Sequence, residues 1–206
     1  MRYGKVFKYG KVKKDMKMYE IKIKSICSML HHGAQAVGME KTIGKKRGGE
    51  ALLGNEEEWK KTIYFKKGVG VYLPAISFEA CMVNAAKQFK ITGRQTATKY
   101  VKSGIFCVDE YLPFLVDGKP IMDLDDSRIQ IDKRTVKNPS TRGRNVRYRA
   151  KFDNWESTFR FIVNSDDYLK KDLLTEIIKY AGNFVGVGDY RPRFGRFELV
   201  SIKEVN

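Results

Sequence analysis

The chain has 206 residues, of which 40 are Lys or Arg and 24 are Asp or Glu, so its formal net charge is +16. Hydrophobic residues make up 42% of the sequence, which excludes an intrinsically disordered polycation and indicates a folded basic protein. No apolar run reaches the roughly 20 residues of a membrane span, and the cationic N-terminus lacks the apolar block of a signal peptide. We therefore expect a cytoplasmic protein with no membrane partner.

The first predicted elements are a basic extension, a strand and a long insertion. Residues 1–17 show no sustained period and form an extension of one domain that covers 18–206. Residues 19–29 alternate isoleucine on one face with lysine on the other, which is typical of a half-buried strand. Residues 31–61 are rich in glycine and lysine, which predicts an insertion, and two short apolar runs over 62–73 indicate a hairpin.

Apolar stripes predict two helices. The first follows Pro74, has Ser77 as its cap and extends to Phe89, with apolar residues spaced i, i+3, i+4 and i+7. The second begins at Asp166 and closes at Gly182.

Further strands are predicted between and after these helices, over 104–116 with a break near Pro113, and over 146–152, 155–163 and 195–205. The chain order is then strand, helix, strands, helix, strand. This order predicts an α+β fold of the ferredoxin-like or RRM-like kind, an antiparallel sheet with two helices on one face.

The positive charge is concentrated in residues 1–17, 84–104 and 128–151. Segregated cations suit a polyanion, because each one that neutralises a phosphate releases a counterion; the alternative is a solvated cationic face without a ligand. Alternation over 146–152 puts three cations on one strand face, which we expect to be the open face of the sheet. The candidate nucleic-acid contacts in these segments are Lys87, Lys90, Arg94, Lys99, Lys102, Arg142, Arg144, Arg147, Arg149 and Lys151.

The segment GNFVGVGDYRPRFGRF, residues 182–197, combines glycines with arginines and aromatic rings. Glycine lets backbone N–H groups approach a phosphate, arginine binds it bidentately and rings stack on bases; the alternative is a purely structural turn. The loop glycines are Gly182, Gly186, Gly188 and Gly195, and the candidate contacts are Tyr190, Arg191, Arg193, Phe194 and Arg196.

A glycine-rich loop between the last helix and the last strand of a ferredoxin-like chain resembles the signature of the RAMP superfamily, the RNA-binding and RNA-processing proteins of CRISPR effector complexes. The first strand followed by a long loop is also similar, and residues 186–197 resemble the ending of phage and prophage proteins with such a fold. The resemblance implies a protein of a bacterial, archaeal or phage-infected cell that binds single-stranded nucleic acid, RNA ahead of ssDNA. It also implies a homo-oligomer or larger ribonucleoprotein, with repeated subunits along the strand.

Superfamily members that cut RNA often use a histidine, and His31 and His32 follow the first strand directly. An imidazole titrates near neutrality and can exchange a proton with a ribose hydroxyl. Binding without catalysis is the leading hypothesis. The alternatives are a metal-independent endoribonuclease that uses these histidines, and a phage structural or anti-defence protein that binds an acidic partner.

No cofactor or metal is predicted. The sequence contains no Walker motif or nucleophile elbow, and its three cysteines lie far apart without a C-x-x-C pair. The acidic run over 123–126 is typical of a polar turn; the alternative is a divalent cation held by the carboxylates of Asp123, Asp125 and Asp126.

Overall fold

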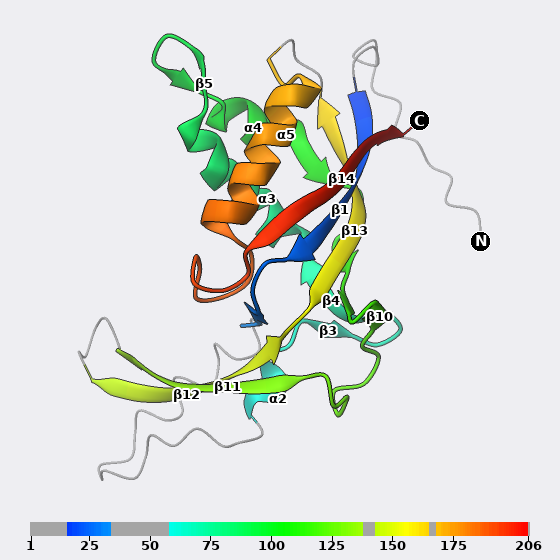
Figure 1. The fold of residues 1–206 in the computed structure, drawn as a ribbon, viewed down its shortest axis with the longest axis vertical. Coiled ribbons are helices and arrows are strands. Elements are labelled where there is room, and N and C mark those ends of the chain that lie inside the picture. The colour runs from blue at the N-terminus through cyan, green and yellow to red at the C-terminus, as the bar shows by residue number, and fades with distance from the viewer. Residues whose placement is uncertain (1–15, 34–57, 138–142, 165–167, 206) are drawn as a thin grey trace.

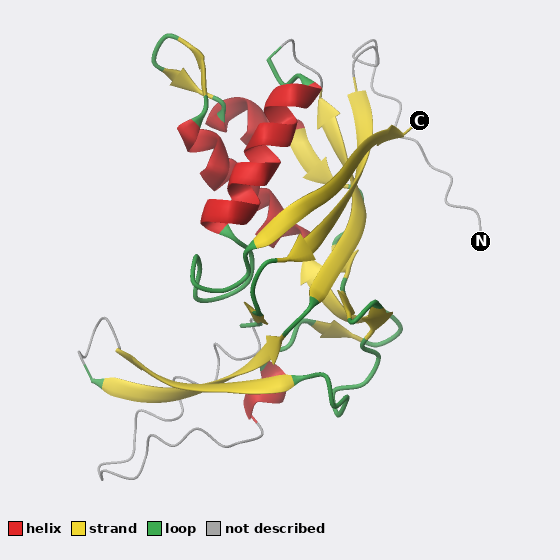
Figure 2. Cartoon of the chain, in the orientation of Figure 1, coloured by secondary structure: helices red, strands yellow, loops and turns green. Residues whose placement is uncertain are grey.

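The computed structural model describes four stretches of the chain, residues 16–33, 58–137, 143–164 and 168–205. Most of the predicted extension over 1–17 and of the predicted insertion over 31–61 lies outside the described residues, as does Arg142. The described chain is mixed α and β, and its strands pair in antiparallel sheets (Figures 1 and 2). No helix in these stretches is long and apolar enough to cross a membrane.

The centre of the fold is a sheet in which the first of the described strands lies between the last two. Its four main strands are, in spatial order, β14 (Phe197–Val205), β1 (Met16–Ser25), β13 (Trp155–Asn164) and β7 (Ile105–Cys107). All neighbouring pairs are antiparallel. Two short strands, β9 (Leu115–Val116) and β10 (Lys119–Pro120), continue the sheet beside the start of β13.

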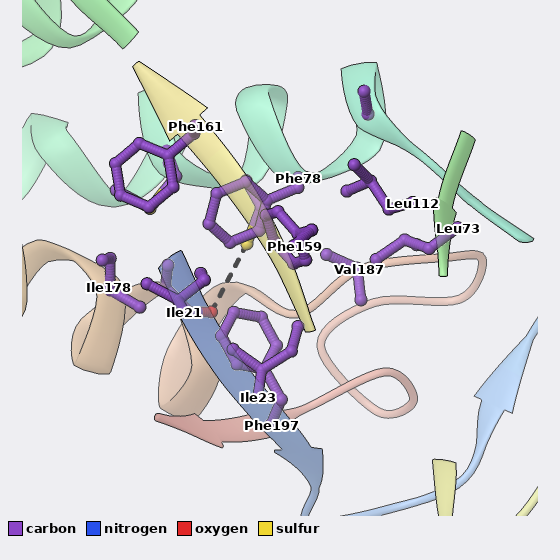
Figure 3. Packing of buried hydrophobic residues seen from close by; sticks show 14 of the residues in the cluster. Ile21, Ile23, Leu73, Phe78, Leu112, Phe159, Phe161, Ile178, Val187 and Phe197 are labelled. Atoms are coloured by element: carbon purple, nitrogen blue, oxygen red, sulfur yellow. Dashed lines mark hydrogen bonds between the residues drawn. The ribbon is translucent and has the colours of Figure 1, made fainter. Parts of the chain in front are cut away.

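Two helices cover one face of this sheet (Figure 1). They are α3 (Ala75–Ala85), extended by a 3₁₀ turn (Ala86–Gln88), and α5 (Lys171–Tyr180), extended by a π turn (Ala181–Val185). The predicted apolar stripes are confirmed as core: Phe78 and Ile178 are fully buried and point toward Ile21 and Phe161 of the sheet (Figure 3). Each such side chain stabilises the fold by about 1.5–3 kcal/mol.

The helix ends differ from the predictions. The N-cap of α3 is Pro74, which makes no side-chain cap hydrogen bond, so the predicted cap at Ser77 is wrong. Proline already fixes φ near the helical value at this entry. Helix α5 begins at Lys171, later than predicted, and the predicted stop at Gly182 is wrong because the π turn carries the chain on to Gly186, where φ is +76°.

A long two-stranded arm projects beyond the main sheet (Figure 1). It consists of β11 (Gln130–Lys137) and β12 (Arg144–Phe152), and β2 (Met29–Leu30) pairs with the base of β12. The predicted cationic row of Arg147, Arg149 and Lys151 therefore lies on the arm, and its predicted place on the open face of the main sheet is wrong. Alternation identifies a strand but not the sheet that the strand joins.

The open face of the main sheet carries acids and bases that offset one another. Glu20 lies opposite Arg160 on one side and Lys203 on the other, and Lys22 Nζ is 2.9 Å from Glu156 Oε2. Opposite charges on neighbouring strands attract one another at the expense of an outside anion. This face is therefore less suited to phosphates than the sequence predicted.

Smaller elements complete the fold. The hairpin of β3 (Phe65–Lys66) and β4 (Gly70–Pro74) confirms the one predicted over 62–73, and β8 (Tyr111–Pro113) pairs with β4. The predicted strand over 104–116 is divided among β7, β8 and β9. The remaining elements are the hairpin of β5 (Lys90–Thr92) and β6 (Gln95–Thr96), with α4 (Thr98–Gly104) and α2 (Glu58–Lys61).

Candidate nucleic-acid interface

The glycine-rich loop, residues 186–196, is folded tightly against itself and against β2. Val187 N–H donates to Gly195 O at 2.9 Å, Gly195 N–H donates to Ser28 O at 2.8 Å, and Asp189 N–H donates to Leu30 O at 2.8 Å. A Cβ at Gly195 would lie 1.7 Å from Val187 O, and φ at Gly195 is +75°. These backbone donors and glycines thus serve the packing of the loop, and the prediction that they form a phosphate cradle is wrong at these positions.

A second set of contacts fastens the C-terminal end of the loop to the chain after β1. Arg196 N–H donates to Cys27 Sγ at 3.3 Å, and Arg196 Nε donates to Pro192 O at 2.8 Å. Gly182 is equally constrained, because a Cβ there would lie 2.0 Å from Phe197 O. Arg196, predicted to contact nucleic acid, holds the loop together in this structure.

The loop is also joined to the arm through two arginines. Arg149 is only 5% exposed, and its Nε lies 2.6 Å from Asp189 Oδ2. Arg134 lies over two loop rings, with its guanidinium carbon 4.9 Å from the centroid of Tyr190 and 4.7 Å from that of Phe194. Arg149 and Phe194, both predicted contacts, are therefore engaged within the protein.

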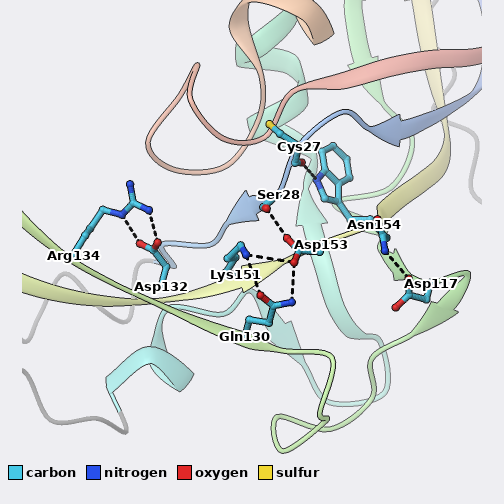
Figure 4. A network of polar contacts seen from close by, with 10 residues as sticks. Cys27, Ser28, Asp117, Gln130, Asp132, Arg134, Lys151, Asp153 and Asn154 are labelled. Carbon is cyan, nitrogen blue, oxygen red and sulfur yellow. Dashed lines mark hydrogen bonds and ion pairs between the residues drawn. The ribbon is translucent and has the colours of Figure 1, made fainter.

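Figure 4 shows that other cations of the arm are also engaged within the protein. Arg134 Nε donates to Asp132 Oδ2 at 2.6 Å, and Lys151 Nζ donates to Gln130 Oε1 at 3.0 Å and lies 3.3 Å from Asp153 Oδ2. The pKa of the Asp153 carboxyl is lowered, although its burial acts in the opposite direction, because Ser28, Gln130 and Lys151 donate to it.

The remaining predicted cations lie on the surface. Exposed side chains occur on the 3₁₀ turn, β5–β6 and α4, on the loop tip, and at the start of β12: Lys87, Lys90, Arg94, Lys99, Lys102, Arg191, Arg193 and Arg144. None of these forms an ion pair with a carboxylate in the described part of the chain. Arg147 is half-buried.

The elements that carry these exposed cations lie along one edge of the view in Figure 1. In Figure 1 the β5–β6 hairpin lies at the top left and the β11–β12 arm at the bottom left, with the glycine-rich loop between them. The structure thus brings the loop and the arm into contact and leaves the β5–α4 cations at the other end of the same side.

The two histidines lie at the base of the arm. His31 is fully buried, and its ring centroid is 4.6 Å from that of Phe152 and 5.3 Å from that of Phe114. Burial lowers the pKa of His31 to about 3, and its Nδ1 accepts a hydrogen bond from Tyr64 N–H at 3.4 Å. A neutral imidazole enclosed by aromatic rings cannot reach a ribose, so the prediction that His31 is a catalytic acid or base is wrong. His32 is half-buried, and its role stays a prediction.

The acidic run over 123–126, predicted as a polar turn, and the adjacent Arg128 have structural contacts. Asp123 Oδ1 accepts from Asp125 N–H at 3.0 Å in the polar turn, and Asp126 is bound by the guanidinium of Arg128. Arg128 also donates to carbonyl oxygens of the β9–β10 hairpin, including Val116 O at 2.8 Å. Although Arg128 belongs to the basic segment over 128–151, it holds a turn.

An open hollow of about 510 Å³ lies between the end of α3, the π turn and the tip of the glycine-rich loop. Its lining residues are Asn84, Phe184, Val185, Gly188, Asp189, Tyr190, Arg191 and Pro192. The sequence predictions included Tyr190 and Arg191 but missed Asn84 and Phe184. Phe184 could have been found as a further ring within GNFVG, whereas an exposed Asn at a helix end carries no signal.

No family model and no curated protein matches the sequence. Among solved structures, the fold is similar to a chain in the cryo-EM structure of the type III-B Cmr-β complex bound to cognate target RNA. The two chains are 8% identical and superpose with a TM-score of 0.46, and the match covers 93% of this chain and 61% of that chain. The chain therefore spans about three-fifths of the length of the chain that it matches.

Proposed function

We propose that the protein binds single-stranded nucleic acid, RNA ahead of ssDNA, along the side that runs from β5–β6 past the glycine-rich loop to the arm. The observation that carries the proposal is the set of exposed cations on this side that have no carboxylate partner among the described residues. Lysines and arginines that neutralise phosphates release condensed counterions, and this release supplies most of the affinity of a sequence-independent strand binder.

The geometry favours a single strand over a folded acidic protein surface. An exposed ring accompanies the cations at the loop tip, where Tyr190 is 46% exposed beside Arg191 and Arg193. Rings placed among cations can stack on unpaired bases while the cations contact the phosphates.

The finer assignment that we propose is a ferredoxin-like core of the RAMP type. Its support is the strand order β14–β1–β13–β7 with α3 and α5 on one face, together with a glycine-rich loop between the last helix and the last strand. We further propose that copies repeat along one strand, because the exposed cations lie at both ends of the same side of the molecule.

Binding of labelled single-stranded RNA, single-stranded DNA and duplex, measured by fluorescence anisotropy over a salt series, tests this function. We expect the logarithm of the affinity to fall by about 0.7 per phosphate contact for each tenfold rise in salt. A double substitution, Arg191→Ala with Arg193→Ala, should weaken strand binding and reduce the salt slope.

The matched control removes the same charge from the open face of the sheet, as Arg160→Ala with Lys203→Ala. Affinity should change little in this control, because both residues lie on strands of the main sheet opposite Glu20 and belong to none of the elements of the proposed path. A flat salt response would contradict the proposal and favour an acidic protein partner. An equal loss in both double variants would contradict the proposed path along the loop.

A further inference from the structure

We propose that the hollow beside the glycine-rich loop is a subsite for one unstacked nucleobase of the bound strand, and that it prefers a base with an exocyclic amino group over uracil. This inference rests on the proposed function and adds a base-reading role to it. The volume of the hollow, about 510 Å³, lies within the range of about 300–1,000 Å³ that is usual for small-molecule sites.

Two aromatic rings at the rim are held from behind while much of their surface is exposed. Phe184 is 61% exposed, and its ring lies 4.6 Å from that of Tyr180, which in turn packs edge-on against Phe89. Tyr190 is 46% exposed, with the Arg134 guanidinium over its ring. Rings that are fixed before a ligand arrives lose little conformational freedom when a base stacks on them.

The backbone at Tyr190 is in an unusual conformation that positions this ring. Its φ is +57°, which is rare for an aromatic residue and costs on the order of 1–3 kcal/mol. The conformation is fixed on both sides, because Asp189 N–H donates to Leu30 O and Phe194 N–H donates to Tyr190 O at 3.3 Å. Such strain concentrates at ligand-binding positions, and here it places a ring at the rim of an open hollow.

The polar lining supplies a hydrogen-bond acceptor for a base and a hydrogen-bond donor for a phosphate. The carboxylate of Asp189 is held by Arg149 through one oxygen, and it can accept from an amino group of adenine, cytosine or guanine. Uracil has no amino group, and its single N3–H donor lies between two carbonyl oxygens that a carboxylate repels. Asn84 is oriented by Ala80 O and Lys87 Nζ, and the exposed Arg191 can contact the adjoining phosphate.

The test uses the full chain and a short oligouridine that carries one central 2-aminopurine, an amino-bearing purine whose fluorescence falls when it stacks. We expect binding to quench the probe. Phe184→Ala should restore most of the emission and weaken binding about fivefold, the lower end of what a base–aromatic stack contributes. The matched control is Ile76→Ala, which removes a 73% exposed apolar side chain from α3, outside the hollow, and should leave quenching and affinity unchanged.

Base preference is measured with the same oligouridine carrying a single central adenosine, cytidine or guanosine. Each should bind about threefold tighter than oligouridine itself, as one added hydrogen bond predicts. If the strand binds with a steep salt response but neither quenching nor preference is seen, the subsite is wrong and the proposed function stands. If no strand binds, both are overturned.

Discussion

Replacing His31 by phenylalanine should remove an acid sensitivity that the wild-type protein carries. In the folded state the pKa of His31 is lowered to about 3 by burial, against 6.5 in an unfolded chain. Below pH 6.5 the unfolded state therefore binds a proton that the folded state does not bind. The stability that the neutral His31 contributes is fully present above pH 6.5 and is lost as pH falls toward 3. Relative to pH 7, the linkage relation gives a loss of about 1.3 kcal/mol at pH 5.5 and about 2.5 kcal/mol at pH 4.5.

The assay is urea unfolding of wild type and His31→Phe at pH 7.0, 5.5 and 4.5, followed by tryptophan fluorescence. Phenylalanine fits the ring cluster but leaves Tyr64 N–H without its acceptor, which costs the variant a constant amount at every pH. His32 and all carboxylates are present in both proteins, so their titrations cancel in the comparison. If wild type loses no more stability than the variant between pH 7.0 and 4.5, the reasoning about a buried neutral imidazole is refuted.

Three further predictions concern stability and are checked by urea unfolding. Gly195→Ala should cost more than about 3 kcal/mol because its Cβ meets a backbone carbonyl, whereas Gly118→Ala, with the same φ of +75° and open space around it, should cost only about 1 kcal/mol. Asp189→Asn should cost about 3 kcal/mol because it leaves the buried guanidinium of Arg149 without its counter-charge, and Asp189→Leu combined with Arg149→Met should recover part of that loss. Equal stability of the single and double variants would contradict the ion-pair account. Arg128→Lys should lower the free energy of unfolding by about 1–2 kcal/mol, since an ammonium cannot reach all the partners of the guanidinium. Strand affinity should not change in this variant. Weaker strand binding at unchanged stability would place Arg128 in the interface.

Periodicity was sufficient to predict the core of this fold. The apolar stripes of both helices and the alternating strands around Ile21 and Phe161 are buried as predicted, because a side chain's face within a helix or strand depends on local geometry alone. Which strands pair with one another was not predictable in this way. The strand over 146–152 alternates like the others, yet it joins β11 and β2 instead of the main sheet.

The candidate site was harder to predict because its residues are assigned by contacts distant in sequence. Arg147 and Arg149 lie on the same face of one strand, but the glycine-rich loop contacts Arg149 through Asp189 and buries it. The same loop fixes Tyr190 at the rim of the hollow, opposite Phe184 on the π turn. Charge clustering therefore identified the relevant segments, but it could not separate the cations that hold the protein together from those that are available to a ligand.

The position of β1 between β13 and β14 has a consequence for biosynthesis. The ribosome makes β1, which ends at Ser25, well before its two neighbours, which span residues 155–164 and 197–205. Until both are made, an apolar strand bearing Ile21 and Ile23 has two unpaired edges, a state that favours association with other chains. Newly made chains should therefore depend on chaperones until β14 has been made, and truncation before β14 should yield insoluble protein.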